Sequence, residues 1–135
     1  MGQLANGVAP HETLRKLISA TRTLTGLPFA VNLIIETTAF GPLATEAHLR
    51  VCIEERVPAV VFHWAPPPVE WVRMLKDAPC DVWLQTSSIA TAQAAIASGV
   101  DIIIAQGSEA AGTTGVRQVY SPCCHAWSML CIPRP

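Results

Sequence analysis

Polar side chains with hydrogen-bonding or acid–base chemistry stand in or just after short apolar segments of this sequence. They are Asn32, His63, Gln85, Gln106 and Glu109. An amide inside a buried strand needs hydrogen-bond partners, because an unsatisfied polar group costs roughly 1–3 kcal/mol. Asn32 is therefore either satisfied locally or directed at a ligand, and spacing alone favours the local explanation.

A histidine and a tryptophan close another apolar segment, in Phe62-His63-Trp64-Ala65-Pro66. Such a pair can line a pocket, with an aromatic ring stacked on a flat ligand. A histidine beside core residues is more often structural, and we interpret His63 in that way.

The segment 99–112 runs from an apolar stretch into small residues. A strand that ends in such a loop exposes backbone N–H groups, which suit a phosphate or the edge of a flavin ring. Small-residue loops are common, so the glycines alone are weak evidence for a ligand-binding loop. Gln106 and Glu109 in the same loop strengthen the evidence for a binding site, although composition does not identify the ligand.

Alternating elements must position these side chains. Apolar periodicity and turn residues predict helices over 14–24, 45–56, 69–75 and 88–98, and strands over 29–35, 59–62, 82–84 and 100–105. This alternation predicts an α/β fold with a parallel sheet. The runs 59–62 and 102–105 are apolar at every position, which predicts strands covered on both faces. The polar side chains follow the carboxyl ends of the strands, where parallel barrels and doubly wound sheets bind ligands.

Composition restricts the class of protein. The chain has 135 residues, of which 50% are hydrophobic and 14% charged, with a formal net charge of −1. It forms no basic stripe, so we expect no nucleic-acid partner and no anionic membrane partner. The apolar runs are strand-sized, and the start of the chain does not resemble a signal peptide. Five cysteines without metal-ligand spacing favour a reducing, cytoplasmic setting over a disulfide scaffold.

Several segments together resemble the nitronate monooxygenase family, formerly called the 2-nitropropane dioxygenases. Residues 28–33 read Pro-Phe-Ala-Val-Asn-Leu where the family favours Pro-Phe-Gly-Val-Asn-Leu. The most specific match joins Gly-Val-Asp at 99–101 to Ala-Gln-Gly-Ser-Glu-Ala at 105–110, close to the family's Gly-Ala-Asp…Ala-Gln-Gly-x-Glu-Ala-Gly-Gly-His. Residues 61–64 and the helix before Gly99 are also similar. The resemblance runs from the first helix to Ala110.

The resemblance implies an FMN-dependent (β/α)8 TIM barrel, of which this chain is expected to form a part. The family chemistry is the oxidation of an alkyl nitronate, or a related nitroalkane, with FMN and O2. Such a small molecule is the expected partner. An FMN-dependent enoyl-ACP reductase is the alternative enzyme, and a non-catalytic remnant is the alternative from another class.

The resemblance also assigns cofactor-binding positions. Asn32 matches the family's FMN-contacting asparagine, Gln106 matches its flavin-binding glutamine, and Gln85 stands where the family places Gln or Lys near the flavin. Ala111 and Gly112 occupy its paired glycines, whose backbone lies against the cofactor. Ala111 departs from the family, because a methyl group blocks the close approach that glycine permits.

Thr113 stands where the family has a histidine beside the flavin. A threonine hydroxyl is a poor proton acceptor near neutral pH, so we assign no catalytic residue. We expect a partial flavin-binding barrel domain over 1–110 and an atypical tail over 111–135.

A full barrel of this type needs roughly 250 residues. We therefore expect the chain to begin after the family's first strand, to end before the last ones, and to copurify with little or no flavin. Codons that start one base earlier permit family-like sequence in the tail, at the paired glycines and in the next helix. A lost base near the codon of Ala111 is our hypothesis for the tail, and DNA sequencing that finds no restorable frame would reject it.

Overall fold

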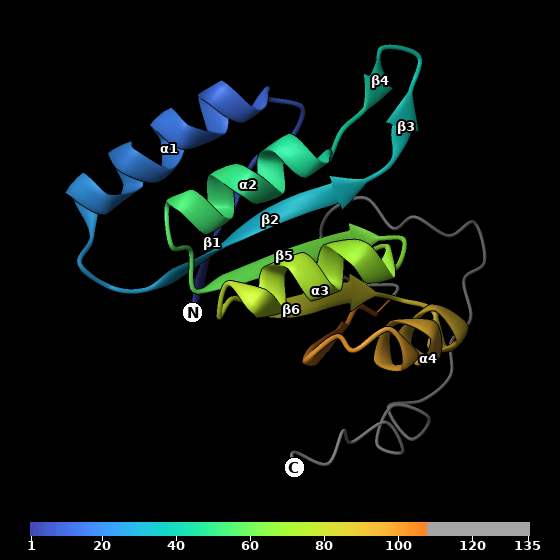
Figure 1. Cartoon of the computed structure of the whole chain (residues 1–135). Coiled ribbons are helices and arrows are strands. Elements are labelled where there is room, and N and C mark those ends of the chain that lie inside the picture. Colours follow the sequence, from blue (N-terminus) through green and yellow to red (C-terminus); the bar gives the residue numbers. More distant parts are fainter. Residues whose placement is uncertain (108–135) are drawn as a thin grey trace.

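The computed structural model describes residues 1–107 (Figure 1). The elements in chain order are β1 (Gly2–Ala5), α1 (His11–Leu24), β2 (Phe29–Ile35), β3 (Thr37–Thr38), β4 (Gly41–Pro42), α2 (Glu46–Glu54), β5 (Ala59–Trp64), α3 (Val69–Asp77), β6 (Asp81–Thr86), α4 (Ile89–Ala97) and β7 (Ile102–Ala105). The predicted positions Glu109, Ala111, Gly112 and Thr113, and the tail to residue 135, lie outside the described residues.

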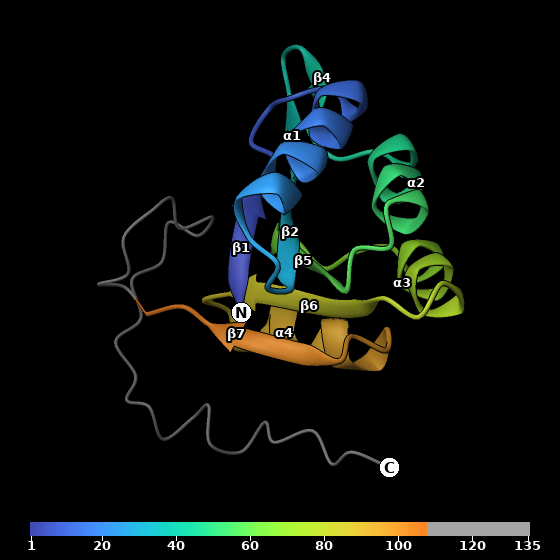
Figure 2. The ribbon, with the colours of Figure 1, turned by 90° about the vertical axis from the view of Figure 1, so that its left-hand side faces the viewer.

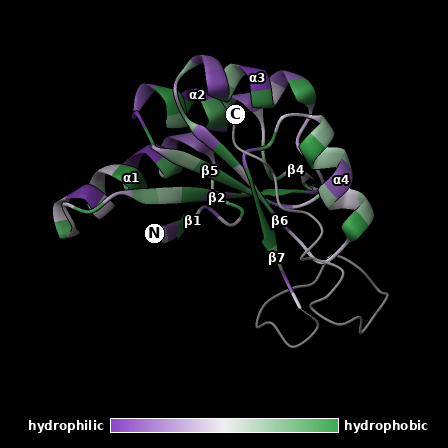
Figure 3. Ribbon diagram, turned by 90° about the horizontal axis from the view of Figure 1, so that it is seen from below, coloured by the Kyte–Doolittle hydropathy of each residue, from purple (hydrophilic) through white to green (hydrophobic). Residues whose placement is uncertain are grey.

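The main sheet has five parallel strands in the order β1-β2-β5-β6-β7, and a short antiparallel hairpin, β3–β4, projects beyond β2. Each parallel strand pairs with the next parallel strand along the chain, and a helix lies between them. Figures 2 and 3 show the helices on one face of the sheet. This is an α/β fold, a part of a (β/α)8 TIM barrel whose sheet is not closed within residues 1–107. The predicted fold class is confirmed.

The sheet begins with a strand that the sequence analysis did not predict. Gly2–Ala5 pair in parallel with β2, so that Gly2 lies opposite Phe29 and Ala5 opposite Asn32. Glycine and alanine have low strand propensity, and the segment becomes a strand because β2 offers it a free edge.

Two apolar clusters lie on opposite faces of the sheet. The larger one packs the helices against side chains such as Val60, Phe62 and Leu84. On the other face, Ala30, Ala59 and Val61 are buried beside Trp83 and Ile104. We call the helix-covered side the outer face and the opposite side the inner face.

The prediction of strands covered on both faces holds for one strand and fails for another. Residues 59–62 are fully buried, which confirms the prediction for β5. In β7 the isoleucines are only half-buried and Ala105 is exposed. Within the described part of the chain β7 pairs with β6 alone, so its position in the sheet, and not its composition, sets its burial.

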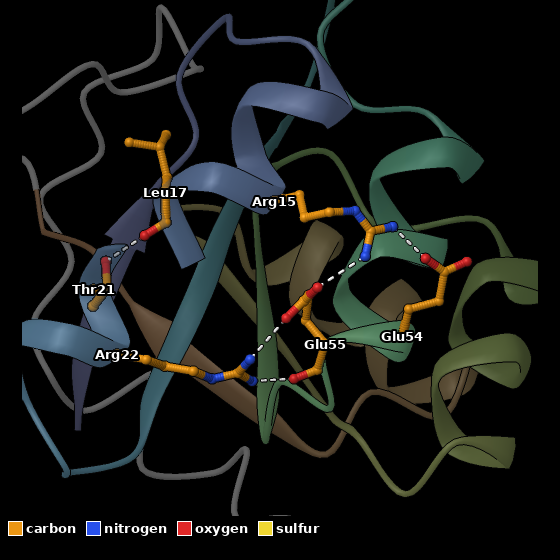
Figure 4. Close-up of polar contacts among 6 residues, drawn as sticks. All are labelled: Arg15, Leu17, Thr21, Arg22, Glu54 and Glu55. Atoms are coloured by element: carbon orange, nitrogen blue, oxygen red, sulfur yellow. Dashed lines mark hydrogen bonds and ion pairs between the residues drawn. The ribbon is translucent and has the colours of Figure 1, made fainter. Parts of the chain in front are cut away.

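An ion-pair network joins α1 to α2 on the outer side (Figure 4). The Arg15 guanidinium pairs with the carboxylates of Glu54 and Glu55, the second at 2.8 Å. Arg22 pairs with the same Glu55 carboxylate at 2.8 Å and also donates to the Glu55 carbonyl. The arginines are about half-exposed, so each pair contributes little, and the network chiefly sets how the two helices align.

His48 connects the start of α2 to the loop after β1. It is 5% exposed, and its Nδ1 accepts from the Thr45 backbone N–H at 3.3 Å as part of a capping box. The other ring nitrogen, Nε2, then carries the ring hydrogen and donates it to the Ala9 carbonyl at 3.0 Å. The imidazole therefore links two loops at the carboxyl end of the sheet.

We predict that the thiols of Cys52 and Cys80 resist alkylation in the folded protein. Burial raises the pKa of the Cys52 thiol to about 12, and burial, followed by the charge of Asp81, raises that of Cys80 to about 11. Since the thiolate is the nucleophile, both groups stay unreactive at pH 8. Mass-spectrometric mapping of iodoacetamide adducts before and after unfolding in urea measures the protection.

The same shifts set a pH dependence of stability. The folded pKa values of both thiols lie above the ordinary value of 9.0. The contribution of the two buried neutral thiols to the free energy of unfolding is therefore complete below pH 9 and disappears as pH rises toward 11 and 12. The urea midpoint should therefore fall between pH 8 and pH 11. Rapid labelling of either native thiol at pH 8 would contradict the burial of these side chains.

Candidate functional site

Polar side chains gather on the inner face at the carboxyl ends of the strands. Val82 and Leu84 belong to the outer cluster, so the alternation of a strand places Gln85 on the inner face. The same alternation places His63 there, because Phe62 faces the helices. His63 and Gln85 are direct neighbours in the β5–β6 register.

Gln106 follows β7 and joins this group. Its backbone N–H donates to the Thr86 carbonyl at 3.0 Å, which holds the residue beside the end of β6. The side chain is 7% exposed, and its Oε1 lies 3.3 Å from His63 Nε2. The amide nitrogen Nε2 is buried without a partner among the described residues. Buried donors are usually satisfied, so this atom is a candidate contact for a ligand acceptor.

Asn32 lies on the same face but at a lower level of the sheet. It is level with Val61, two residues before the level of His63. Its Nδ2 donates to Gln3 Oε1 on β1 at 3.2 Å. The Asn32 amide is therefore satisfied locally, as its spacing in the sequence favoured. The sequence analysis did not foresee the partner, Gln3, because it did not predict β1.

The structure brings together His63, Gln85 and Gln106 and places Asn32 below them. Sequence reasoning treated His63 as a structural residue, because a histidine beside core residues is usually structural, and did not connect it with Gln106, 43 residues away. Its position directly after the all-apolar segment 59–62 was the available signal. Trp83 is a second omission: its indole Nε1 on the inner face is also buried without a described partner.

The backbone of Trp64, at this rim, has an unusual conformation. Its φ is +79°, in the left-handed region, and its ring lies 5.8 Å from that of His63 at 61°. A tryptophan held there costs on the order of 1–3 kcal/mol, and such residues concentrate at functional sites.

A cavity of about 590 Å³ opens next to the β3–β4 hairpin. It lies between the end of β2, the hairpin, the start of α2 and Trp71 of α3. Its lining residues are Ile35, Glu36, Thr37, Pro42, Ala44, Thr45, Glu46, Ala65 and Trp71. The predicted cofactor residues do not line this cavity, so the inner-face group is a separate feature.

Asp101, although part of the most specific motif, lies at the opposite end of the sheet. Gly99 has a φ of +90° and ends α4, and its carbonyl accepts from Lys76 Nζ at 2.8 Å. The Asp101 carboxylate accepts from the Val82 backbone N–H at 2.9 Å and pairs with Lys76 at 2.9 Å. This half of the motif therefore holds a turn, whereas Gln106 lies at the rim.

Residues 1–107 contain no group of three or more metal-ligating side chains close enough to hold an ion. Within the same residues, no helix combines the length and the apolar character needed to span a bilayer.

The fold and the rim define a (β/α) barrel protein that places a group of polar side chains at the carboxyl ends of its strands. The family model described as nitronate monooxygenase matches residues 1–126 of the chain. The chain belongs to the nitronate monooxygenase family, which confirms the resemblance inferred from the motifs.

Individual relatives agree with this assignment. The chain is 28% identical over 149 residues to a nitronate monooxygenase of Paraburkholderia phytofirmans, covering 86% of this chain and 41% of that protein. It is similar to the crystal structure of nitroalkane oxidase from Streptomyces ansochromogenes, with a TM-score of 0.78 and 28% identity over 87% of this chain and 42% of that one. It is also similar to FabK from Thermotoga maritima, with a TM-score of 0.74 and 33% identity over 86% of this chain and 35% of that one. The chain spans about two fifths of the length of the nitronate monooxygenases that it matches.

Proposed function

We propose that this chain is a nitronate monooxygenase-type flavoprotein whose inner rim contacts FMN and whose substrates are alkyl nitronates or nitroalkanes. The observation that carries the proposal is the buried Gln106 Nε2 without a described partner, within the family motif that begins at Gly99. The cytoplasm is the compartment that we propose, in line with the family.

The residues present fit a flavin. The edge of an isoalloxazine ring carries carbonyl oxygens and ring nitrogens that accept hydrogen bonds. Gln106 offers a buried amide donor, and Gln85 stands beside it on the same face. Trp83 adds flat aromatic surface on the same inner face.

In this proposal Gln106 and Gln85 hold the ring edge, and Asn32 supports it from below while bonded to Gln3. The backbone of Ala111 and Gly112, outside the described residues, is the further contact that the family resemblance supplies. When bound, FMN supplies the chemistry of accepting electrons from the nitronate and passing them to O2. Thr113 supplies no base, so a nitronate, which is already deprotonated, is a better substrate than the neutral nitroalkane.

We expect the substitution Gln106→Leu to weaken flavin binding about threefold to tenfold, because it removes a hydrogen bond from a buried site. Quenching of FMN fluorescence during titration with the protein measures the change. Riboflavin, which lacks the phosphate, should show the same loss, because Gln106 is proposed to contact the ring. Titration is required because we expect little flavin to copurify.

The matched control is Gln93→Leu, the same substitution at an exposed position on α4. It should leave both titrations unchanged. Equal flavin affinity of the wild type and the Gln106→Leu variant would contradict the proposed site.

The similarity to FabK favours a second candidate function, that of an FMN-dependent enoyl-ACP reductase. Oxidation of NADH or NADPH by the flavin-loaded protein, compared with its oxidation of 2-nitropropane nitronate, separates the two. A folded protein, as judged by circular dichroism, that binds no flavin would instead support a non-catalytic remnant.

A further inference from the structure

The carboxamide of Gln106 can present either of two faces to a ligand. If its oxygen is turned toward His63, its NH2 group faces the ligand and selects a hydrogen-bond acceptor. If it is turned the other way, its oxygen faces the ligand and selects a donor. The partner that Gln106 has on the protein side decides between the two.

We infer that His63 is a positioning residue that fixes Gln106 with its NH2 group toward the ligand. Gln106 Oε1 lies 3.3 Å from His63 Nε2, and a carbonyl oxygen can only accept, so Nε2 must carry the hydrogen. The amide nitrogen of Gln106 is then the atom left without a described partner. The acceptor that it meets is assigned to flavin only through the proposed function.

The surroundings of His63 support this role. The His63 ring lies 5.8 Å from the Trp64 ring at 61°, and Gln85 of β6 is its register neighbour. The Gln106 backbone is held separately by the Thr86 carbonyl at 3.0 Å. With the main chain held, the remaining freedom of Gln106 lies in its side chain, which His63 contacts at the terminal amide.

This arrangement makes the site selective. A rim that presents only donors at this point accepts a flavin carbonyl or an unprotonated ring nitrogen. A ligand with an N–H at the same position would leave its own donor and that of Gln106 facing each other, which is unfavourable. His63 thus sets the hydrogen-bonding polarity of the site without contacting the ligand.

The first test needs no ligand. In protein with ¹⁵N-labelled histidine, long-range ¹H–¹⁵N correlation reports which ring nitrogen carries the proton. The His63 signals, among those of the four histidines in the chain, are assigned by their loss in a His63→Gln variant. We expect the Nε2–H form for His63. A neutral His63 with its proton on Nδ1 would overturn the inference.

The second test measures FMN affinity in a set of variants. His63→Leu should weaken binding about threefold to tenfold, whereas His63→Gln, which retains an N–H near the position of Nε2, should stay within about twofold of the wild type. The double variant His63→Leu/Gln106→Leu should bind no more weakly than Gln106→Leu alone, because His63 acts through Gln106.

Additive losses in the double variant, or failure of His63→Gln to restore binding, would show that His63 has only a structural role. If His63→Leu does not fold, as judged by circular dichroism, the comparison of His63→Gln with His63→Asn, which places its N–H elsewhere, decides the same question. A wild type that binds no flavin would refute the proposed function, while the proton position on His63 would still decide this inference.

Discussion

The substitution Phe62→Ala should destabilise the folded chain by about 3–5 kcal/mol, the range measured for truncating a buried aromatic side chain. Phe62 is fully buried on β5, the central strand of the five, and its ring centroid lies 6.1 Å from that of Trp71 on α3. Small domains have a total stability of about 5–15 kcal/mol, so this single change removes a large part of it. Urea unfolding followed by circular dichroism measures the loss as a shift in midpoint.

The matched control is Phe40→Ala in the turn between β3 and β4. Phe40 is fully exposed, with a relative accessibility of 101%, so its truncation should change stability by no more than about 0.5 kcal/mol. Equal urea midpoints for the two variants would mean that β5 is not the centre of the core.

The substitution Asp101→Ala should cost about 1.5–3 kcal/mol, the range for a hydrogen bond to a charged group. The bond to the fully buried Val82 dominates this effect. The ion pair with Lys76 adds little, because the Lys76 side chain is 45% exposed and solvent screens the charges. The same urea experiment measures the loss.

Two further variants separate these contributions. Asp101→Asn keeps an oxygen for the Val82 N–H and removes the charge, so it should lose less than half as much stability as Asp101→Ala. Asp77→Ala, at an exposed position at the end of α3, should be nearly neutral. Flavin affinity should not fall in a folded Asp101→Asn variant, because Asp101 lies at the end of the sheet away from the rim. A selective loss of flavin binding would contradict this placement.

The local pattern of residues was sufficient to predict the order of the four helices and of the parallel strands from β2 to β7, but it missed the short β3–β4 hairpin. Hydrophobic periodicity is a short-range property, so helices and strands with a strong apolar face, such as 59–62, can be identified from it. It failed for Gly2–Ala5 and for the burial of β7, because both depend on which strands lie beside them. Which strand lies at the edge of a sheet depends on strand pairing in the tertiary structure, and a short stretch of sequence does not show that pairing.

For the candidate site, motif similarity singled out Asn32, Gln85 and Gln106 but did not show how they are arranged. The tertiary structure placed Asn32 beside Gln3, brought Gln106 to His63 across 43 residues, and sent Asp101 of the same motif to the opposite end of the sheet. The two ends of a strand lie at opposite edges of a parallel sheet. Residues of one motif that flank the same strand can therefore serve stability at one edge and ligand binding at the other. The amino-acid sequence by itself determined the family and the alternation of strands and helices. Only the fold decided which polar groups meet, because hydrogen bonds depend on distances in space that chain separation does not set.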